Sequence, residues 1–594
     1  MWKQAEKEVK GAADKYLSPW NINKEKGGFR AASFVYGFVF LDNIGFIANM
    51  VSMVLYFTLV MHFNLSGGST TLTNFMGCTF LLSLIGGFIS DTYINRFHTC
   101  LLFGILEVLG LALVTIQARY KSLQPDSCKI EESSCLKGGI SVMFYGSLAL
   151  LALGSGGVRG ALPALGADQF DAKDPKKAEA LASYFNYLVL ATSAGACIGV
   201  TFVVYLSMHV HWYWGFFVAT VLSCIAFVVL YIGQPFYRLQ VPEDSPLVKV
   251  LQVIVVAIKN RKLSLAENSG ELHEVSEKES ELSADPRIPH TKQFSWLDKA
   301  AILRKESKQD PAALTGWTIC TVTQVEEVKI ITRMLPIIFS TIIMNTCLAQ
   351  LQTFSVEQGF IMDRFLGSFQ IEAPTIPVIP LFFMCILIPL YEYVFVPFAR
   401  KFTNHPTGIT QLQRVGVGLI LSVVSMAVAG IVEVKRRNYA LDHPGESISI
   451  FWLSLQFGIF GIADMFTLVG LLEFFYREAP IKMRSLSTSF TWISLSFGYF
   501  LSTIFVNVIN SVTKKVTPSK KGWLHGQDLN ANNLDLFYWF LAILSCLNFI
   551  NYLYWANWYK YKTEQVMFEP RAQESVSTSA AFLIKKNDGK AGKE

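Results

Sequence analysis

Residues 154–171 read GSGGVRGALPALGADQFD, and they decide the fold. An apolar run from Ile140 to Leu153 leads into them, so Arg159 stands inside an expected membrane-spanning helix. At the helical rise, Arg159 lies about 14 Å from the polar end at Asp168, near the middle of a bilayer core about 30 Å thick. A permanent charge at that depth is costly unless it faces a watery cavity or a paired acid, which makes Arg159 a candidate functional residue. The alternative is that Arg159 only braces two helices.

The composition indicates a polytopic membrane protein. The 594 residues are 52% hydrophobic and 16% charged, which is too apolar for a soluble chain of this length. The net charge of +6 requires no nucleic-acid partner, because cytoplasmic loops of membrane proteins are basic. Residues 1–20 are polar and lack the apolar region of a cleaved secretory signal. The sequence has no CxxC, HExxH or Walker motif, so we expect no metal and no cofactor.

The apolar runs predict an all-α membrane protein with twelve transmembrane helices in two groups of six. The predicted domains are an N-terminal tail (1–31), a six-helix bundle (32–234), a linker (235–333), a second six-helix bundle (334–558) and a C-terminal tail (559–594). The predicted helices cover 32–59, 70–90, 97–118, 140–166, 180–206, 212–234, 334–357, 376–399, 411–434, 449–475, 485–512 and 535–558.

The distribution of Lys and Arg predicts the orientation. With both termini in the cytoplasm, most basic residues fall in cytoplasmic segments, although Lys435-Arg436-Arg437 and the lysines at 514–521 go against the trend. The start of the linker, 247–258, is apolar with basic flanks and is expected to lie along the membrane surface as an interfacial helix. The polar middle of the linker and the C-terminal tail are expected to be disordered.

Two of the ten cysteines stand apart from the apolar runs. Cys128 and Cys135 bracket a polar loop that this topology places outside the cell. The two residues either form a disulfide with each other or remain free thiols, and the sequence leaves both alternatives open.

The GGVR at 156–159 followed by GADQFD at 166–171 resembles the fourth-helix signature of the proton-coupled oligopeptide transporters, and specifically the plant nitrate transporter/peptide transporter family, a branch of the major facilitator superfamily. The resemblance implies two six-helix bundles in the major facilitator arrangement, with the cation at 159 facing the central substrate cavity. It extends over most of the chain through LDKAA (297–301), TQVEEVK (323–329), QLQR (411–414) and EFFYREAP (473–480).

A second motif follows the second helix. GGFISD at 86–91 with Arg96 resembles the major facilitator loop motif, in which glycine permits tight packing and Asp and Arg latch neighbouring helices on the cytoplasmic side. The expected gating and structural residues are Gly87, Asp91, Arg96, Asp168 and Asp171. The alternative for the motif is an ordinary turn that ends a helix.

The first helix departs from the family. The family has Glu-x-x-Glu-Arg/Lys, two carboxylates and a cation held responsible for proton coupling, where residues 39–43 read VFLDN. Asp42 and Asn49 share one helix face, which we expect to be the cavity face. Asp464 matches a tenth-helix Glu that lines the family's site. Asp42 and Asp464 are each a candidate proton carrier, or alternatively a structural partner of Arg159.

The seventh helix departs as well. Asn345 and Gln352 share one face, and Leu348 stands where nitrate-carrying relatives are thought to place a His. Ala349 replaces a carboxylate of bacterial peptide-carrying relatives. The predicted substrate-binding residues are Arg159, Asp42, Asn49, Asn345, Leu348, Gln352, Asp464 and Tyr187.

A cavity with one fixed cation and apolar walls suits an amphipathic organic anion. The changes in the first and seventh helices resemble those of the fourth subfamily of the plant family. This resemblance implies transport by alternating access of a carboxylate hormone of the abscisic acid or gibberellin type, or of nitrate. A proton gradient is the candidate energy source, and we expect the plasma membrane rather than the vacuolar membrane. The alternatives are a di/tripeptide transporter and a non-transporting receptor for the same ligand; an enzyme is disfavoured, because no nucleophile–base pair is visible in the helices.

Overall fold

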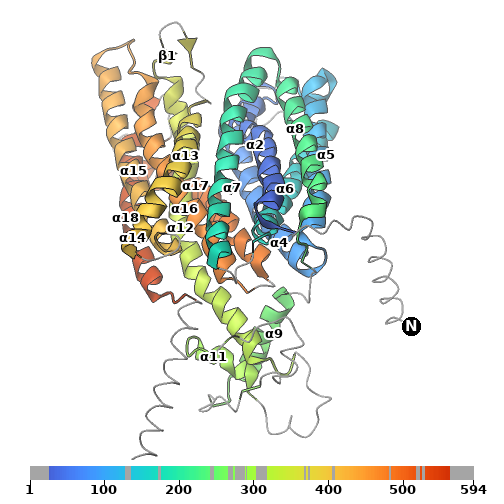
Figure 1. The fold of residues 1–594 in the computed structure, drawn as a ribbon. Coiled ribbons are helices and arrows are strands. Elements are labelled where there is room, and N and C mark those ends of the chain that lie inside the picture. The colour runs from blue at the N-terminus through green and yellow to red at the C-terminus, as the bar shows by residue number, and fades with distance from the viewer. Residues whose placement is uncertain are drawn as a thin grey trace, which may run out of the picture.

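The computed structural model describes residues 26–63, 65–126, 136–170, 175–240, 246–264, 272–273, 288, 290–302, 317–366, 369–371, 375–403, 408–480, 483–516, 522–524 and 529–561. Within these residues, twelve helices are long and apolar enough to cross a membrane. They form two bundles that stand side by side, the first blue to green and the second yellow to red (Figure 1). The predicted all-α, twelve-helix architecture is confirmed.

The N-terminal bundle comprises α2 (Gly28–Leu59), α3 (Leu65–Leu81), α4 (Ser83–Thr92), α5 (Arg96–Arg119), α6 (Gly138–Ala167), α7 (Pro175–Ile198) and α8 (Trp212–Ile232). Two π-helical turns, Gly199–Val203 and Leu206–Val210, prolong α7. The second predicted helix consists of two pieces, because α3 and α4 meet at a break at Leu82.

The C-terminal bundle comprises α12 (Val322–Phe360), α13 (Val378–Leu390), α14 (Val396–Thr403), α15 (Gln411–Asp442), α16 (Leu453–Glu478), α17 (Arg484–Val516) and α18 (Leu534–Trp558). A π-helical turn, Tyr391–Phe395, joins α13 to α14 as one span. Two short antiparallel strands, β1 (Phe365–Leu366) and β2 (Phe369–Gln370), follow α12.

The helix α12 begins at Val322, well before the predicted start at residue 334. Thr321 caps it through a capping box with Gln324, in which each side chain accepts from the other residue's backbone N–H. The first turns of α12 carry charged side chains, so a search for apolar runs did not include them in the predicted span. In the structure these charges pair with one another, as described below. The helix therefore extends out of the bundle toward the linker (Figure 1).

The linker forms a small layer at one end of the molecule, which we call the linker end; the opposite end is the far end. The linker helices α9 (Pro246–Lys259) and α11 (Ser295–Asp298) pack on the protruding part of α12 around an apolar cluster that includes Val253, Leu297 and Val325. The expected helix at 247–258 is present as α9. Most of the remaining linker and the C-terminal tail lie outside the described residues, as do Cys128 and Cys135.

Candidate functional site

The glycines of the fourth span allow α6 to touch its neighbours through the backbone. A Cβ atom on Gly154 would lie 2.3 Å from the Glu107 nitrogen of α5, and one on Gly86 of α4 would lie 2.1 Å from the Gly157 oxygen. Small residues permit this close helix approach in membranes. The glycine run thereby fixes α6 between α4 and α5 and sets the position of Arg159.

The Arg159 guanidinium lies inside the N-terminal bundle. Its Nη2 is 3.9 Å from Asp42 Oδ2, its Nη1 donates to the Ser155 carbonyl at 3.3 Å, and its carbon lies 3.6 Å from the centre of the Phe46 ring. Only 11% of the Arg159 side chain is exposed. Among the described residues, Asp42 is thus the one carboxylate within 4 Å of the guanidinium, at a distance too long for a strong hydrogen bond, and the buried Glu107 carboxylate interacts with Arg159 electrostatically.

Buried polar groups surround this pair. Ser223 donates to Asp42 Oδ1 at 2.8 Å, and Ser155 donates to the Glu107 carboxylate. Asp42, Asn49, Glu107 and Ser223 line one small cavity, of which about 10 Å³ is open to the centre of a water molecule, roughly one water site. The buried Asn49 Nδ2 has no hydrogen-bond partner among the described residues, so a water in this cavity is its natural partner.

A larger cavity lies between the two bundles, in their far-end half; we call it the inter-bundle cavity. It has a volume of about 110 Å³. Glu357 of α12 is the charged residue of its lining, which is otherwise mainly apolar. The lining residues are Met50, Val51, Val54, Leu55, Thr58, Leu72, Thr73, Met76, Ala349, Gln352, Thr353, Val356, Glu357, Phe360, Pro377, Tyr499 and Ser502.

Arg159 is not among the residues that line this cavity. Phe46, which covers the guanidinium, is one helical turn from Met50, which lines the cavity, so the two side chains share a face of α2. Phe46 thus covers Arg159 on the face of α2 that lines the cavity one turn further on.

The predicted residues of the C-terminal bundle occupy different positions. Gln352 lines the cavity and accepts a hydrogen bond from Tyr499 at 2.5 Å, and Asp464 interacts electrostatically with the same Tyr499. Asn345 donates to Ser494 at 3.0 Å and is not among the residues that line the cavity. Leu348 packs against the core of the C-terminal bundle.

At the linker end, charged and polar groups join the two bundles. Arg96 pairs with Asp91 at 3.0 Å and with Asp168, all three from the N-terminal bundle. Asp91 accepts from the Leu486 N–H at 2.9 Å, and Asp168 accepts from the Tyr476 hydroxyl at 2.7 Å, both donors being in the C-terminal bundle. This linker-end network brings together the predicted Asp91, Arg96 and Asp168.

Gly87 lies in the same interface, because a Cβ there would meet the Ser485 carbonyl at 2.9 Å across the bundles. The fifth predicted residue of this group, Asp171, lies outside the described residues.

A second set of inter-bundle contacts involves α7. Asn186 donates to Glu392 at 2.5 Å and accepts from Arg414 at 2.7 Å. Tyr187, predicted to bind substrate, hydrogen-bonds instead with the Tyr393 hydroxyl of the opposite bundle at 2.9 Å. The bundles are thus joined at the linker end, while the inter-bundle cavity lies in the far-end half.

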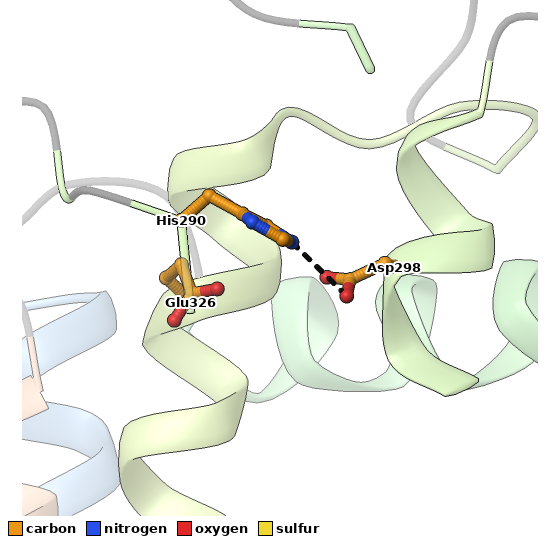
Figure 2. A group of neighbouring side chains, drawn as sticks. All are labelled: His290, Asp298 and Glu326. Carbon is orange, nitrogen blue, oxygen red and sulfur yellow. Dashed lines mark ion pairs between the residues drawn. The ribbon is translucent and has the colours of Figure 1, made fainter. Parts of the chain in front are cut away.

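His290, Asp298 and Glu326 gather where the linker meets α12 (Figure 2). His290 Nε2 lies 3.1 Å from Asp298 Oδ2, a grouping that resembles a metal site. The Lys329 ammonium, however, lies 2.7 Å from both Asp298 Oδ1 and Glu326 Oε1, and Arg333 lies 3.4 Å from Glu326. Two cations already neutralise the carboxylates, so this cluster fastens the linker to α12.

Sequence reasoning did not single out Phe46, Ser223, Tyr499 or Glu357 as site residues. Phe46 and Tyr499 were unremarkable among many aromatics. Ser223 stands in a uniformly apolar segment, and its contact with Asp42 depends on how α2 and α8 pack. Glu357 was the one of these four that the sequence could have identified, because it is an acid near the end of a predicted span, where charge is costly.

Comparison with known proteins identifies relatives over nearly the whole chain. The profile of the POT family (PTR2) matches residues 97–524. Protein NRT1/PTR FAMILY 4.6 of Arabidopsis thaliana is 41% identical over 561 residues, covering 91% of this chain and 96% of the relative. Protein NRT1/PTR FAMILY 4.5 of the same plant is 43% identical over 547 residues, covering 90% and 94%.

Solved structures share the fold. An auto inhibited POT family peptide transporter aligns with a TM-score of 0.61 at 19% identity, covering 89% of this chain and 97% of that one. The POT family transporter PepTSo aligns with a TM-score of 0.59 at 18% identity, covering 89% and 99%.

Proposed function

This chain belongs to the POT family of membrane transporters, and we propose that it moves a small organic anion by alternating access, with a carboxylate phytohormone of the abscisic acid or gibberellin type, or nitrate, as its substrate. The observation that carries the proposal is the charge of Arg159 inside a helix long and apolar enough to span a membrane, with one carboxylate within 4 Å, at 3.9 Å. A cation that is incompletely paired in a low-dielectric site attracts an anion.

The lining of the inter-bundle cavity supports an amphipathic substrate. Met50, Val54, Leu72 and Phe360 give it apolar walls, and Gln352 and Tyr499 supply hydrogen-bonding groups on one side. A ligand with an apolar body and one carboxylate matches this distribution, because apolar walls provide affinity and a few polar groups fix orientation. Leu348 supplies no donor to an anion.

Asp42 provides a route to proton coupling. While ionised, it competes with the substrate for Arg159; once protonated, it releases the guanidinium and keeps its hydrogen bond with Ser223. Asp464, beside Tyr499, is the second candidate carrier. In this proposal a proton gradient drives transport, and the substrate anion displaces Phe46 to reach Arg159.

The linker end is proposed to face the cytoplasm, with both termini on that side and the protein in the plasma membrane. The inter-bundle contacts at Asp91, Arg96 and Asp168 then close the cytoplasmic side. The cavity in the far-end half corresponds to a state that receives substrate from outside. Return to the cytoplasmic side requires the two bundles to rock about the central site.

The experiment is an uptake panel in oocytes with nitrate, abscisic acid, gibberellin and a dipeptide, each in acidic and in neutral medium. The proposal predicts saturable uptake of at least one of the three anions and none of the dipeptide. Saturable binding without flux would indicate a receptor and contradict the proposal.

Glu357 favours one second candidate, a peptide substrate, because its carboxylate in the cavity lining can pair with an ammonium group. Glu357→Gln distinguishes the two. If an anion is carried, removing the like charge lowers its KM by a few-fold, corresponding to about 1 kcal/mol. If a peptide is carried, the same change raises KM. Gln352→Glu, which adds an acid to the same lining, is the matched variant. It should change KM in the direction opposite to Glu357→Gln for either kind of substrate.

A further inference from the structure

Two thiols meet between the bundles. Cys197 belongs to α7 of the N-terminal bundle and Cys385 to α13 of the C-terminal bundle, and the two helices pack against each other. The two thiols interact with each other where these helices pack. Both cysteines are free and half-buried.

The contact is part of a continuous interface rather than an isolated approach. One helical turn before Cys197, Ser193 Oγ donates to the sulfur of Met384 at 3.7 Å. Further toward the linker end, Tyr187 of the same helix meets Tyr393. A cysteine side chain has a single rotatable bond before its sulfur, so the packing of α7 on α13 fixes where both thiols lie.

The position of the pair gives it a mechanical consequence. The helices α7 and α13 come from opposite bundles, and alternating access requires these bundles to move relative to each other. Other contacts across this interface, such as that between Ser193 and Met384, break and re-form without chemical change. A covalent bond between Cys197 and Cys385 would instead hold the two helices together until it is reduced.

We propose that Cys197 and Cys385 form a reversible disulfide that locks the two bundles in the arrangement seen here, with hydrogen peroxide as the oxidant. One thiolate attacks a peroxide oxygen, which breaks the O–O bond and gives a sulfenic acid and water. The second thiol attacks that sulfur and releases a second water. In total, two thiols and one peroxide give one disulfide and two waters, and a dithiol reductant reverses the reaction by exchange.

The direct test is chemical and uses the full-length protein in proteoliposomes. The protein is treated with hydrogen peroxide, free thiols are blocked with N-ethylmaleimide, and peptides are analysed without reduction. A linked peptide containing Cys197 and Cys385 is expected, together with its loss after dithiothreitol. A protein in which both thiols remain open to alkylation after peroxide would overturn the proposal. This readout does not depend on transport.

The locking function rests on the proposed alternating-access transport and is tested by uptake. In wild-type protein, peroxide is expected to reduce uptake several-fold, and dithiothreitol to restore it. Cys197→Ser and Cys385→Ser should transport normally and lose this sensitivity. The exposed Cys224 and Cys546 provide the control, since Cys224→Ser and Cys546→Ser should stay sensitive. A linked peptide accompanied by unchanged uptake would contradict the lock, whereas absence of uptake in untreated wild type would count against the proposed transport alone.

Discussion

Arg159 is held by contacts that an anion can replace. Its contacts are one carboxylate at 3.9 Å, one carbonyl at 3.3 Å and the face of Phe46. A cation–π contact contributes about 1–2 kcal/mol when desolvated, and a hydrogen bond of this length contributes less than a short one. A bound carboxylate or nitrate in bidentate geometry gives more than this set, so substrate binding at Arg159 is energetically reasonable.

At this scale Asp42 is predicted to carry the pH response. Asp42→Asn keeps a hydrogen-bond acceptor for Ser223 but removes the charge that competes for Arg159. Wild-type uptake should be faster in acidic than in neutral medium, and the variant should show the same uptake in both. Initial uptake rates across external pH provide the measurement. Asp464→Asn, the second candidate carrier, is measured beside it. A pH response preserved in Asp42→Asn and lost in Asp464→Asn would assign the role to Asp464 and exclude Asp42.

At the scale of elements, Gly87 controls how closely α4 approaches α17. In Gly87→Ala, the new Cβ would lie 2.6 Å from Ser489 Oγ and 2.9 Å from the Ser485 carbonyl, and the latter is backbone that cannot rotate away. We expect overpacking of about 1–3 kcal/mol against the closed linker end and a loss of uptake of about tenfold or more.

Gly146→Ala in α6 is the matched control, because a Cβ there meets nothing within 4 Å. Uptake at equal surface expression is measured for both variants, together with labelling of a cysteine introduced at the linker end. Labelling should rise only in Gly87→Ala. Equal uptake and equal labelling in the two variants would show that Gly87 plays no part in closure.

The junction between the linker and α12 depends on Lys329. This fully buried ammonium pairs with Asp298 and Glu326. Lys329→Met leaves two buried carboxylates with less compensation, which is expected to destabilise the protein by about 3–5 kcal/mol. Thermal unfolding of the purified protein measures the effect. Lys292→Met, which removes an exposed lysine of the same segment, should change stability by less than about 0.5 kcal/mol, and an equal effect of both changes would contradict the assignment.

Elements were predictable from sequence where one physical signal dominated. Runs of apolar residues identified all twelve spans, because length and hydropathy suffice for a helix in lipid. The start of α12 at Val322 was not predictable, since its charges at Glu326, Lys329 and Arg333 are paired only through the fold. The grouping of Arg96 with Asp91 and Asp168 was predictable through family resemblance. The contact of Arg159 with Phe46 was not, because it depends on side-chain packing within the bundle.

At the scale of the whole molecule, the two bundles meet at the linker end and along both sides. Polar networks around Arg96 and Asn186 join them at the linker end. The helix pair α7–α13 joins them along one side, and α17 packs on α3 and α4 along the other, where Ser496 donates to the Gly77 carbonyl at 2.7 Å. The inter-bundle cavity separates them in the far-end half. In the proposed alternating access, the contacts at the linker end break while the substrate enters from the far end. In the proposed mechanism, an anion that enters this cavity reaches Arg159 after Phe46 moves.

The most direct measurement is uptake of the best anionic substrate by Arg159→Gln, with Arg159→Lys beside it and surface expression matched to wild type. Gln keeps a polar side chain but removes the charge, so uptake should fall to background at every substrate concentration. Lys keeps the charge and should retain partial uptake with a raised KM. Arg159→Gln that transports the anion with unchanged KM would show that the guanidinium only braces helices and would contradict the account.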